Sequence, residues 1–196
     1  MLSTTDAIVL SLQPHSDKAY MLHAYTRTGG RVNYMVYGLG RKNPRGQYSP
    51  FSLIQITADH TPNKPPIIKE VTPLLSHDES IYKQTIRLFI CEILYHVLKH
   101  PMQDEPMFDF LAQAILELDQ TNTPQNFHLQ FLIDFAAKLG FAIPEESNPL
   151  SALRAPSSFT RKARQETLRF LCAYFEEHVD TWQPPKSLDI LIEVFD

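Results

Sequence analysis

The segment TRTGGRVNYMVYGLGRKNPRG, residues 26–46, carries five cationic side chains and no Asp or Glu. Its Thr-Gly-Gly turn joins two alternating runs, which predicts a β-hairpin. The second run then opens into a glycine-rich basic loop. Basic and aromatic side chains on a small β scaffold suit a phosphate backbone and exposed bases. We therefore expect nucleic-acid contacts from Arg27, Arg31, Tyr37, Arg41, Lys42 and Arg45.

Two tyrosines lie in the predicted strand 31–37, and they fall on opposite faces of it. At most one of them is therefore free to stack on a base. We assign that role to Tyr37 and a core position to Tyr34. The competing interpretation is a solvated hairpin whose positive charge is incidental.

Short apolar or β-branched runs recur along the first 75 residues and predict five strands. A Pro-rich turn at 59–66 and the loop 38–48 separate the later runs. Since no helical pattern intervenes, we predict a small closed barrel over residues 1–76. The predicted strands are 7–12, 20–26, 31–37, 51–58 and 67–72.

The hydrophobic period then changes from two to 3.6, which predicts helices. Pro106 fits the first turn of one helix, and Gly140 fits the end of another. Residues 142–158 are rich in Pro, Ser and Asn and predict a long loop. We expect residues 77–196 to form an all-helical bundle, so the chain is predicted to be an α+β multidomain protein. The predicted helices are 80–99, 106–118, a third ending at 139, 160–179 and 188–195.

The charge changes sign between the two halves. Hydrophobic residues make up 43% of the chain, enough for a buried core, and the formal net charge is −4. Residues 1–75 hold eight Lys/Arg and four Asp/Glu, whereas the other 121 residues hold ten and eighteen. This asymmetry indicates two modules with different partners.

A second cationic cluster lies in the acidic half, where the helix predicted at 160–179 begins. Positive charge at a helix start opposes the macrodipole, so it does not serve helix stability. DNA or an acidic peptide would explain the cluster; the alternative is an ordinary solvated face. Its members are Arg154, Arg161, Lys162, Arg164 and Arg169.

Cofactor and export signals are missing from the sequence. Cys91 and Cys172 are too few for a disulfide framework or a zinc cluster, so we predict buried, reduced thiols. Glu92, His96 and His100 have helical spacing but no fourth ligand, and we predict no metal. No apolar run reaches the roughly 18 residues of a membrane span, and the N-terminus lacks an export signal. We therefore expect a cytoplasmic protein.

Catalytic motifs are missing as well. The sequence has no Gly-x-Ser-x-Gly, no Walker loop and no complete dinucleotide fingerprint. Gly38-Leu39-Gly40 is only a fragment of that fingerprint. We predict a non-enzymatic protein without a cofactor.

The order of these features resembles the N-terminal half of the RecO family of bacterial recombination mediators. The helical half resembles the family more loosely, through its helix order and Lys138-Leu139-Gly140-Phe141. The matching pieces are Ala7-Ile8-Val9-Leu10, Asp17-Lys18, YTRTGGR at 25–31, YGLGRK at 37–42 and SPFSL at 49–53.

This resemblance implies an N-terminal OB-fold, a helical C-terminal domain and no catalytic chemistry. Family members bind single- and double-stranded DNA and anneal complementary strands. With RecR they help load RecA onto DNA coated by single-strand-binding protein, whose acidic, Phe-ended tail they contact. The resemblance thus implies a nucleoid-associated protein without a membrane partner. The alternative is a protein–protein adaptor whose barrel binds a peptide or subunit and has weak DNA affinity.

The chain departs from the family at one place. Many members carry a four-cysteine zinc site after the Leu-Gly-aromatic helix end. Here the corresponding segment, residues 144–149, reads PEESNP and contains no cysteine. We therefore expect no zinc.

Overall fold

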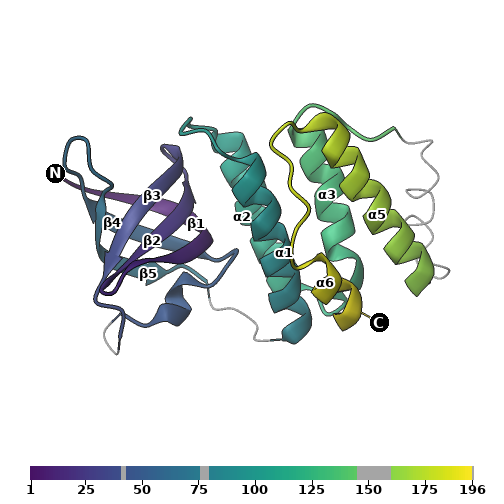
Figure 1. The fold of residues 1–196 in the computed structure, drawn as a ribbon, viewed down its shortest axis with the longest axis horizontal. Coiled ribbons are helices and arrows are strands. Elements are labelled where there is room, and N and C mark those ends of the chain that lie inside the picture. The colour runs from purple at the N-terminus through teal and green to yellow at the C-terminus, as the bar shows by residue number, and fades with distance from the viewer. Residues whose placement is uncertain (41–42, 76–79, 145–159, 196) are drawn as a thin grey trace.

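The computed structural model describes residues 1–40, 43–75, 80–144 and 160–195. A closed five-stranded barrel comes first, and helices follow it (Figure 1). The predicted fold class, an OB-type barrel followed by an all-helical part, is confirmed. The predicted boundary at residue 76 lies outside the described residues.

Five strands close the barrel in the order β1-β2-β3-β5-β4. Only β3 and β5 run parallel, meeting at Met35 and Ile67, and the other neighbours are antiparallel. The strands are β1 (Leu2–Ser16), β2 (Ala19–Thr26), β3 (Gly30–Tyr37), β4 (Leu53–Asp59) and β5 (Ile67–Pro73).

β1 is longer at both ends than the predicted strand 7–12. Its first half pairs with β4, from Leu2 opposite Asp59 to Ile8 opposite Leu53. Its second half pairs with β2 and contains an irregularity between Val9 and Ser11. Because a bulge bends a strand, β1 can pair with β4 along its first half and with β2 along its second half, which closes the barrel.

Small and branched aliphatic side chains fill the barrel together with two tyrosine rings, Tyr34 and Tyr48. Tyr34 is 2% exposed inside it, and burial raises the pKa of this phenol to about 12. The expected core position of Tyr34 is therefore observed. The interior is formed by Ala7, Val9, Leu22, Ala24, Tyr34, Val36, Tyr48, Ile54, Ile56 and Ala58.

Capping groups fix several helix ends. The Asp104 carboxylate accepts a hydrogen bond from the Met107 N–H at 2.9 Å, with Pro106 in the first turn. Thr160 caps its helix through Ala163 N–H at 3.2 Å, and Gly140 (φ +93°) follows the end of another. The helices are α1 (Ile81–Val97), α2 (Glu105–Gln120), α3 (Phe127–Lys138), α5 (Arg161–His178) and α6 (Leu188–Val194), with 3₁₀ turns η1 (Arg45–Tyr48) and η2 (Pro124–Asn126).

The barrel and the helices share one hydrophobic core. Ile8, Leu10, Tyr25 and Phe51 belong to the barrel region but are buried in the same cluster as the helix residues. The Cys91 thiol of α1 donates to the Val9 carbonyl at 3.2 Å, across this junction. Among the described residues, no helix is long and apolar enough to cross a bilayer.

Candidate nucleic-acid interface

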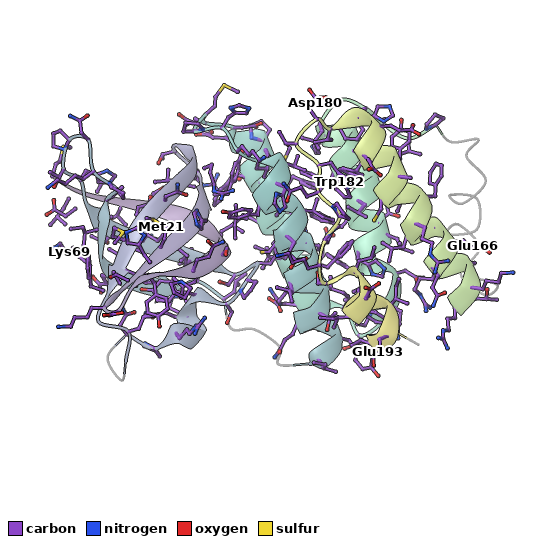
Figure 2. The ribbon with its side chains drawn as sticks, viewed as in Figure 1. Met21, Lys69, Glu166, Asp180, Trp182 and Glu193 are labelled. Atoms are coloured by element: carbon purple, nitrogen blue, oxygen red, sulfur yellow. The ribbon has the colours of Figure 1, made fainter. Side chains whose placement is uncertain are left out.

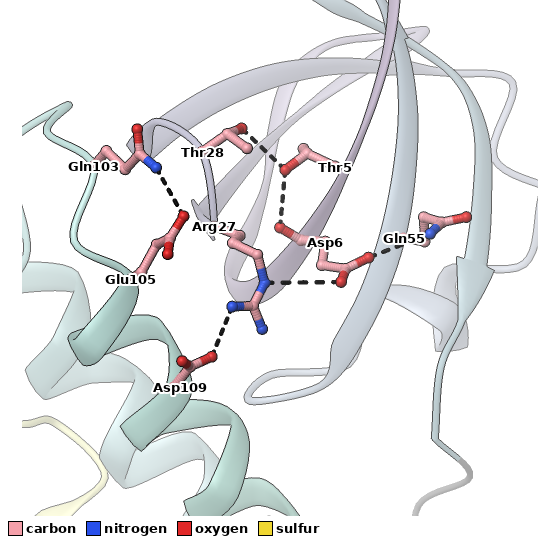
Figure 3. Close-up of polar contacts among 8 residues, drawn as sticks. All are labelled: Thr5, Asp6, Arg27, Thr28, Gln55, Gln103, Glu105 and Asp109. Atoms are coloured by element: carbon pink, nitrogen blue, oxygen red, sulfur yellow. Dashed lines mark hydrogen bonds and ion pairs between the residues drawn. The ribbon is translucent and has the colours of Figure 1, made fainter.

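The turn of the β2–β3 hairpin reaches the helical half through Arg27. The Arg27 Nη1 donates to the Asp109 carboxylate of α2 at 2.7 Å, and its guanidinium lies 4.4 Å from the Phe108 ring centroid. Asp6 of β1 is 4.0 Å away on the other side (Figure 3). Arg27 thus lies between acidic groups of both parts of the chain.

Arg31, at the start of β3, packs against α1. Its guanidinium lies 4.2 Å from the Tyr95 ring centroid, and its Nη1 donates to the carbonyls of Tyr95 at 3.0 Å and Leu98 at 3.4 Å. Burial lowers the pKa of this guanidinium. Two of the six expected contact residues, Arg27 and Arg31, therefore have partners in the helical half.

The opposite end of β3 presents Tyr37. This side chain is 50% exposed, and its backbone carbonyl accepts a hydrogen bond from Asn43 at 3.2 Å. Tyr37 is paired with Ala19, so it lies beside the β1–β2 turn that carries the exposed Lys18. The turn itself, Asp17-Lys18, has no net charge, but an exposed ring beside a lysine is suited to stacking on a base.

The loop after β3 adds positive charge at this end. Arg45 begins η1, is exposed, and has its guanidinium 5.7 Å from the Tyr20 ring centroid. Arg41 and Lys42 lie outside the described residues. We call this end, formed by Lys18, Tyr20, Tyr37 and Arg45, the loop end of the barrel. Sequence reasoning did not include Lys18, which the pairing of Ala19 with Tyr37 brings near that ring, or Tyr20, which pairs with Val36 and lies under Arg45.

The second cationic cluster lies on the first turns of α5. Lys162 forms an i,i+4 ion pair with Glu166 at 3.8 Å, and Arg161 and Arg169 are exposed. The Arg164 Nε donates to the Asn126 side chain at 2.9 Å, and burial lowers the pKa of Arg164. Arg154 is outside the described residues.

Arg161 and Arg164 border a recess whose other walls are mainly apolar. Leu168 of α5, Ile192 of α6 and Phe195 line it. The recess has a volume of only about 10 Å³, too little for an aromatic side chain, so the two arginines can meet an acidic peptide only at the surface beside it.

Two family models match the sequence of this fold. "Recombination protein O N terminal" matches residues 1–74, and "Recombination protein O C terminal" matches residues 78–151. The chain belongs to the RecO family. The bounds of the two RecO models agree with the barrel and with the beginning of the helical half.

Relatives from other bacteria align over nearly the whole chain. The protein named DNA repair protein RecO in Flavobacterium johnsoniae is 29% identical, covering 97% of this chain and 98% of the relative. The protein of that name in Porphyromonas gingivalis is 25% identical, with both chains fully covered. In Bacteroides fragilis the corresponding identity is 27%, again over both full chains.

The metal-ligand candidates of this RecO-family chain have other roles or positions. The Glu92 carboxylate accepts hydrogen bonds from the Ser187 N–H at 2.9 Å and hydroxyl at 2.8 Å. His100 lies beyond the end of α1 at Val97. Within the described ranges, no three His, Cys, Asp or Glu side chains are grouped to hold a metal. Residues 145–149, where RecO resemblance places zinc ligands, are outside those ranges.

Proposed function

We propose that this RecO-family protein binds single- and double-stranded DNA through its barrel and anneals complementary strands. With RecR, it assists RecA loading on DNA coated by single-strand-binding protein. The observation that supports this most is the half-exposed Tyr37 on a closed barrel, beside the turn that carries Lys18 and before the loop that carries Arg45. Binding is electrostatic capture plus base stacking, so no bond is made or broken and no cofactor is needed.

The proposed DNA contacts are Tyr37, Arg45 and the adjacent Arg41 and Lys42. Arg27 and Arg31 are left out because Asp109 binds the first, and the carbonyls of Tyr95 and Leu98 bind the second. Their charge is used to join the two parts of the chain.

Changing Arg41 and Lys42 together to Ala should weaken binding to all DNA sequences. Because each lost phosphate contact removes about 0.9 from the slope of log affinity against log salt, the slope should fall by about two. Fluorescence anisotropy of a labelled oligonucleotide at several salt concentrations measures it. Lys138→Ala on α3 is the matched control, and an unchanged slope in the double variant would reject the assignment.

An annealing assay tests the function itself. Complementary oligonucleotides are mixed with the protein, with and without single-strand-binding protein coating the strands. A DNA-annealing protein accelerates duplex formation in both conditions.

The adaptor function stays as a second candidate because two barrel arginines are already paired within the chain. An adaptor would leave the annealing rate unchanged and still bind its protein partner.

We further propose that Arg161 and Arg164, on the first turn of α5, contact the acidic tail of single-strand-binding protein at the surface. Arg161→Glu should weaken binding of a synthetic acidic peptide ending in Phe by about tenfold, since it replaces attraction by repulsion. Isothermal titration calorimetry measures this affinity, with Lys138→Glu as the control. Equal affinities of the two variants and the unmodified protein would exclude this contact.

A further inference from the structure

The outer face of β1, β2 and β3 leads from the loop end of the barrel to α1. Directly paired residues share a face, and Gln13 pairs with Met21, which pairs with Met35. The next row joins His23 to Asn33, whose side chains are hydrogen-bonded at 2.6 Å. Figure 2 shows Met21 on the barrel. Residues 37, 35, 33 and 31 of β3 therefore share one side of the sheet between the loop end and the helices, with Met35 itself only 9% exposed.

Tyr95 of α1 stands where this face meets the helical half. The His23 ring contacts the Tyr95 ring edge-on, with centroids 5.1 Å apart, and the Arg31 guanidinium covers the same ring. His96 follows, its ring 5.3 Å from that of Tyr95. The rings of Tyr95 and His96 thus lie at the end of the barrel face that meets α1.

A cleft of about 460 Å³ opens beside these rings. Ser11 and Gln13 of β1 form one wall, Tyr95 and His96 form another, and the segment before α6 contributes Gln183 and Lys186. The segment is held in place because Trp182 packs on Phe175 of α5, with ring centroids 5.3 Å apart (Figure 2). The volume lies within the roughly 300–1,000 Å³ of small-molecule sites.

The chemistry of the walls suits a nucleotide. Aromatic rings offer a stacking surface, the amides of Gln13 and Gln183 hydrogen-bond base edges, and the exposed Lys186 matches a phosphate. Glu92 also lines the cleft, but its carboxylate is bound by the Ser187 N–H and hydroxyl. The cleft therefore combines stacking, hydrogen-bonding and cationic groups.

We propose that this cleft receives one unstacked base of a single strand lying across the β1–β3 face. The base packs against Tyr95 and His96, and the neighbouring phosphate meets Lys186. This inference rests on the proposed DNA binding and deepens it, because it gives the protein a reason to distinguish single strands from duplex. A duplex keeps its bases paired and offers none to the cleft.

Two variants test the cleft without altering the loop end. Ser11→Trp fills it, and Lys186→Ala removes its cation; Lys138→Ala is the control. Anisotropy is measured with a labelled oligothymidylate and with a mixed-sequence duplex of the same length. We expect each cleft variant to weaken single-strand binding about tenfold and to change duplex binding less than twofold.

Lys186 is exposed, so the Lys186→Ala variant is expected to fold. Thermal unfolding checks that the Ser11→Trp variant is folded. If the unmodified protein binds the single strand and both cleft variants bind it equally well, the cleft inference is wrong and the proposed function stands. That result would also favour a peptide as the occupant. Equal loss of single-strand and duplex binding would likewise overturn the cleft inference, since an equal loss indicates a general phosphate contact. If the unmodified protein binds neither DNA, both proposals fail.

Discussion

Replacing Gly30 by Ala is expected to lower the free energy of unfolding by about 3 kcal/mol or more. Gly30 has φ +58°, which a side chain disfavours, and this alone costs about 1 kcal/mol. A Cβ atom here would also lie 2.3 Å from the Met102 carbonyl oxygen and 2.8 Å from its nitrogen. These are backbone atoms, so no rotamer change relieves the clash, and the hairpin must move away from the helical half.

Substitutions at two other glycines separate the two causes of the stability loss at Gly30, which are backbone strain and the steric clash. Gly38 has φ +65° with open space around it, so Gly38→Ala reports the backbone strain alone, about 1 kcal/mol. Gly29 meets only side chains at 3.4 Å, so Gly29→Ala should be mild. Urea unfolding followed by circular dichroism measures all three. A Gly30→Ala protein as stable as Gly38→Ala would show that the hairpin does not dock tightly.

Arg87→Met should lower the free energy of unfolding by about 3–5 kcal/mol, the usual effect of breaking a buried ion pair. The Arg87 side chain is 4% exposed; it donates to the Phe51 carbonyl at 2.7 Å and pairs with Asp119, which is 16% exposed. Removing the guanidinium leaves a shielded carboxylate and an unpaired carbonyl at the junction.

The exposed ion pair of Lys162 with Glu166 gives the comparison. Its side chains are 86% and 60% exposed, so Lys162→Ala should change stability by less than about 0.5 kcal/mol. The double variant Arg87→Met with Asp119→Asn should recover part of the Arg87 loss, because the neutral amide no longer carries the charge that Arg87 balanced. Equal stability of Arg87→Met and Lys162→Ala in urea would contradict the role of Arg87.

The local sequence pattern was enough to predict most of the strands and helices. Alternation in residues 31–37 correctly separated the buried Tyr34 from the exposed Tyr37. Turn and capping residues located helix ends, as Pro106 and Gly140 show. These features depend on neighbours within a few residues, which is why sequence alone reveals them.

Contacts between distant segments could not be predicted from the sequence. Asp109 is 82 residues from Arg27, and Tyr95 is 64 residues from Arg31. The sequence of a hairpin whose arginines bind DNA therefore looks the same as that of a hairpin whose arginines contact the helical half. Similarly, the burial of Tyr25 and Phe51 outside the barrel interior depends on α1 and its neighbours. Among the described cations of the segment 26–46, the fold therefore distinguishes Arg27 and Arg31, which contact the helical half, from the exposed Arg45.

Photo-crosslinking tests most directly whether a single strand lies across the outer face of β1–β3. An oligonucleotide containing 5-iododeoxyuridine is bound and irradiated, and the attached peptides are identified by mass spectrometry. We predict adducts on the peptides that contain Tyr37 and Tyr95, at the two ends of the face. Adducts confined to α2, α3 or α5, with none on the barrel, would contradict this account.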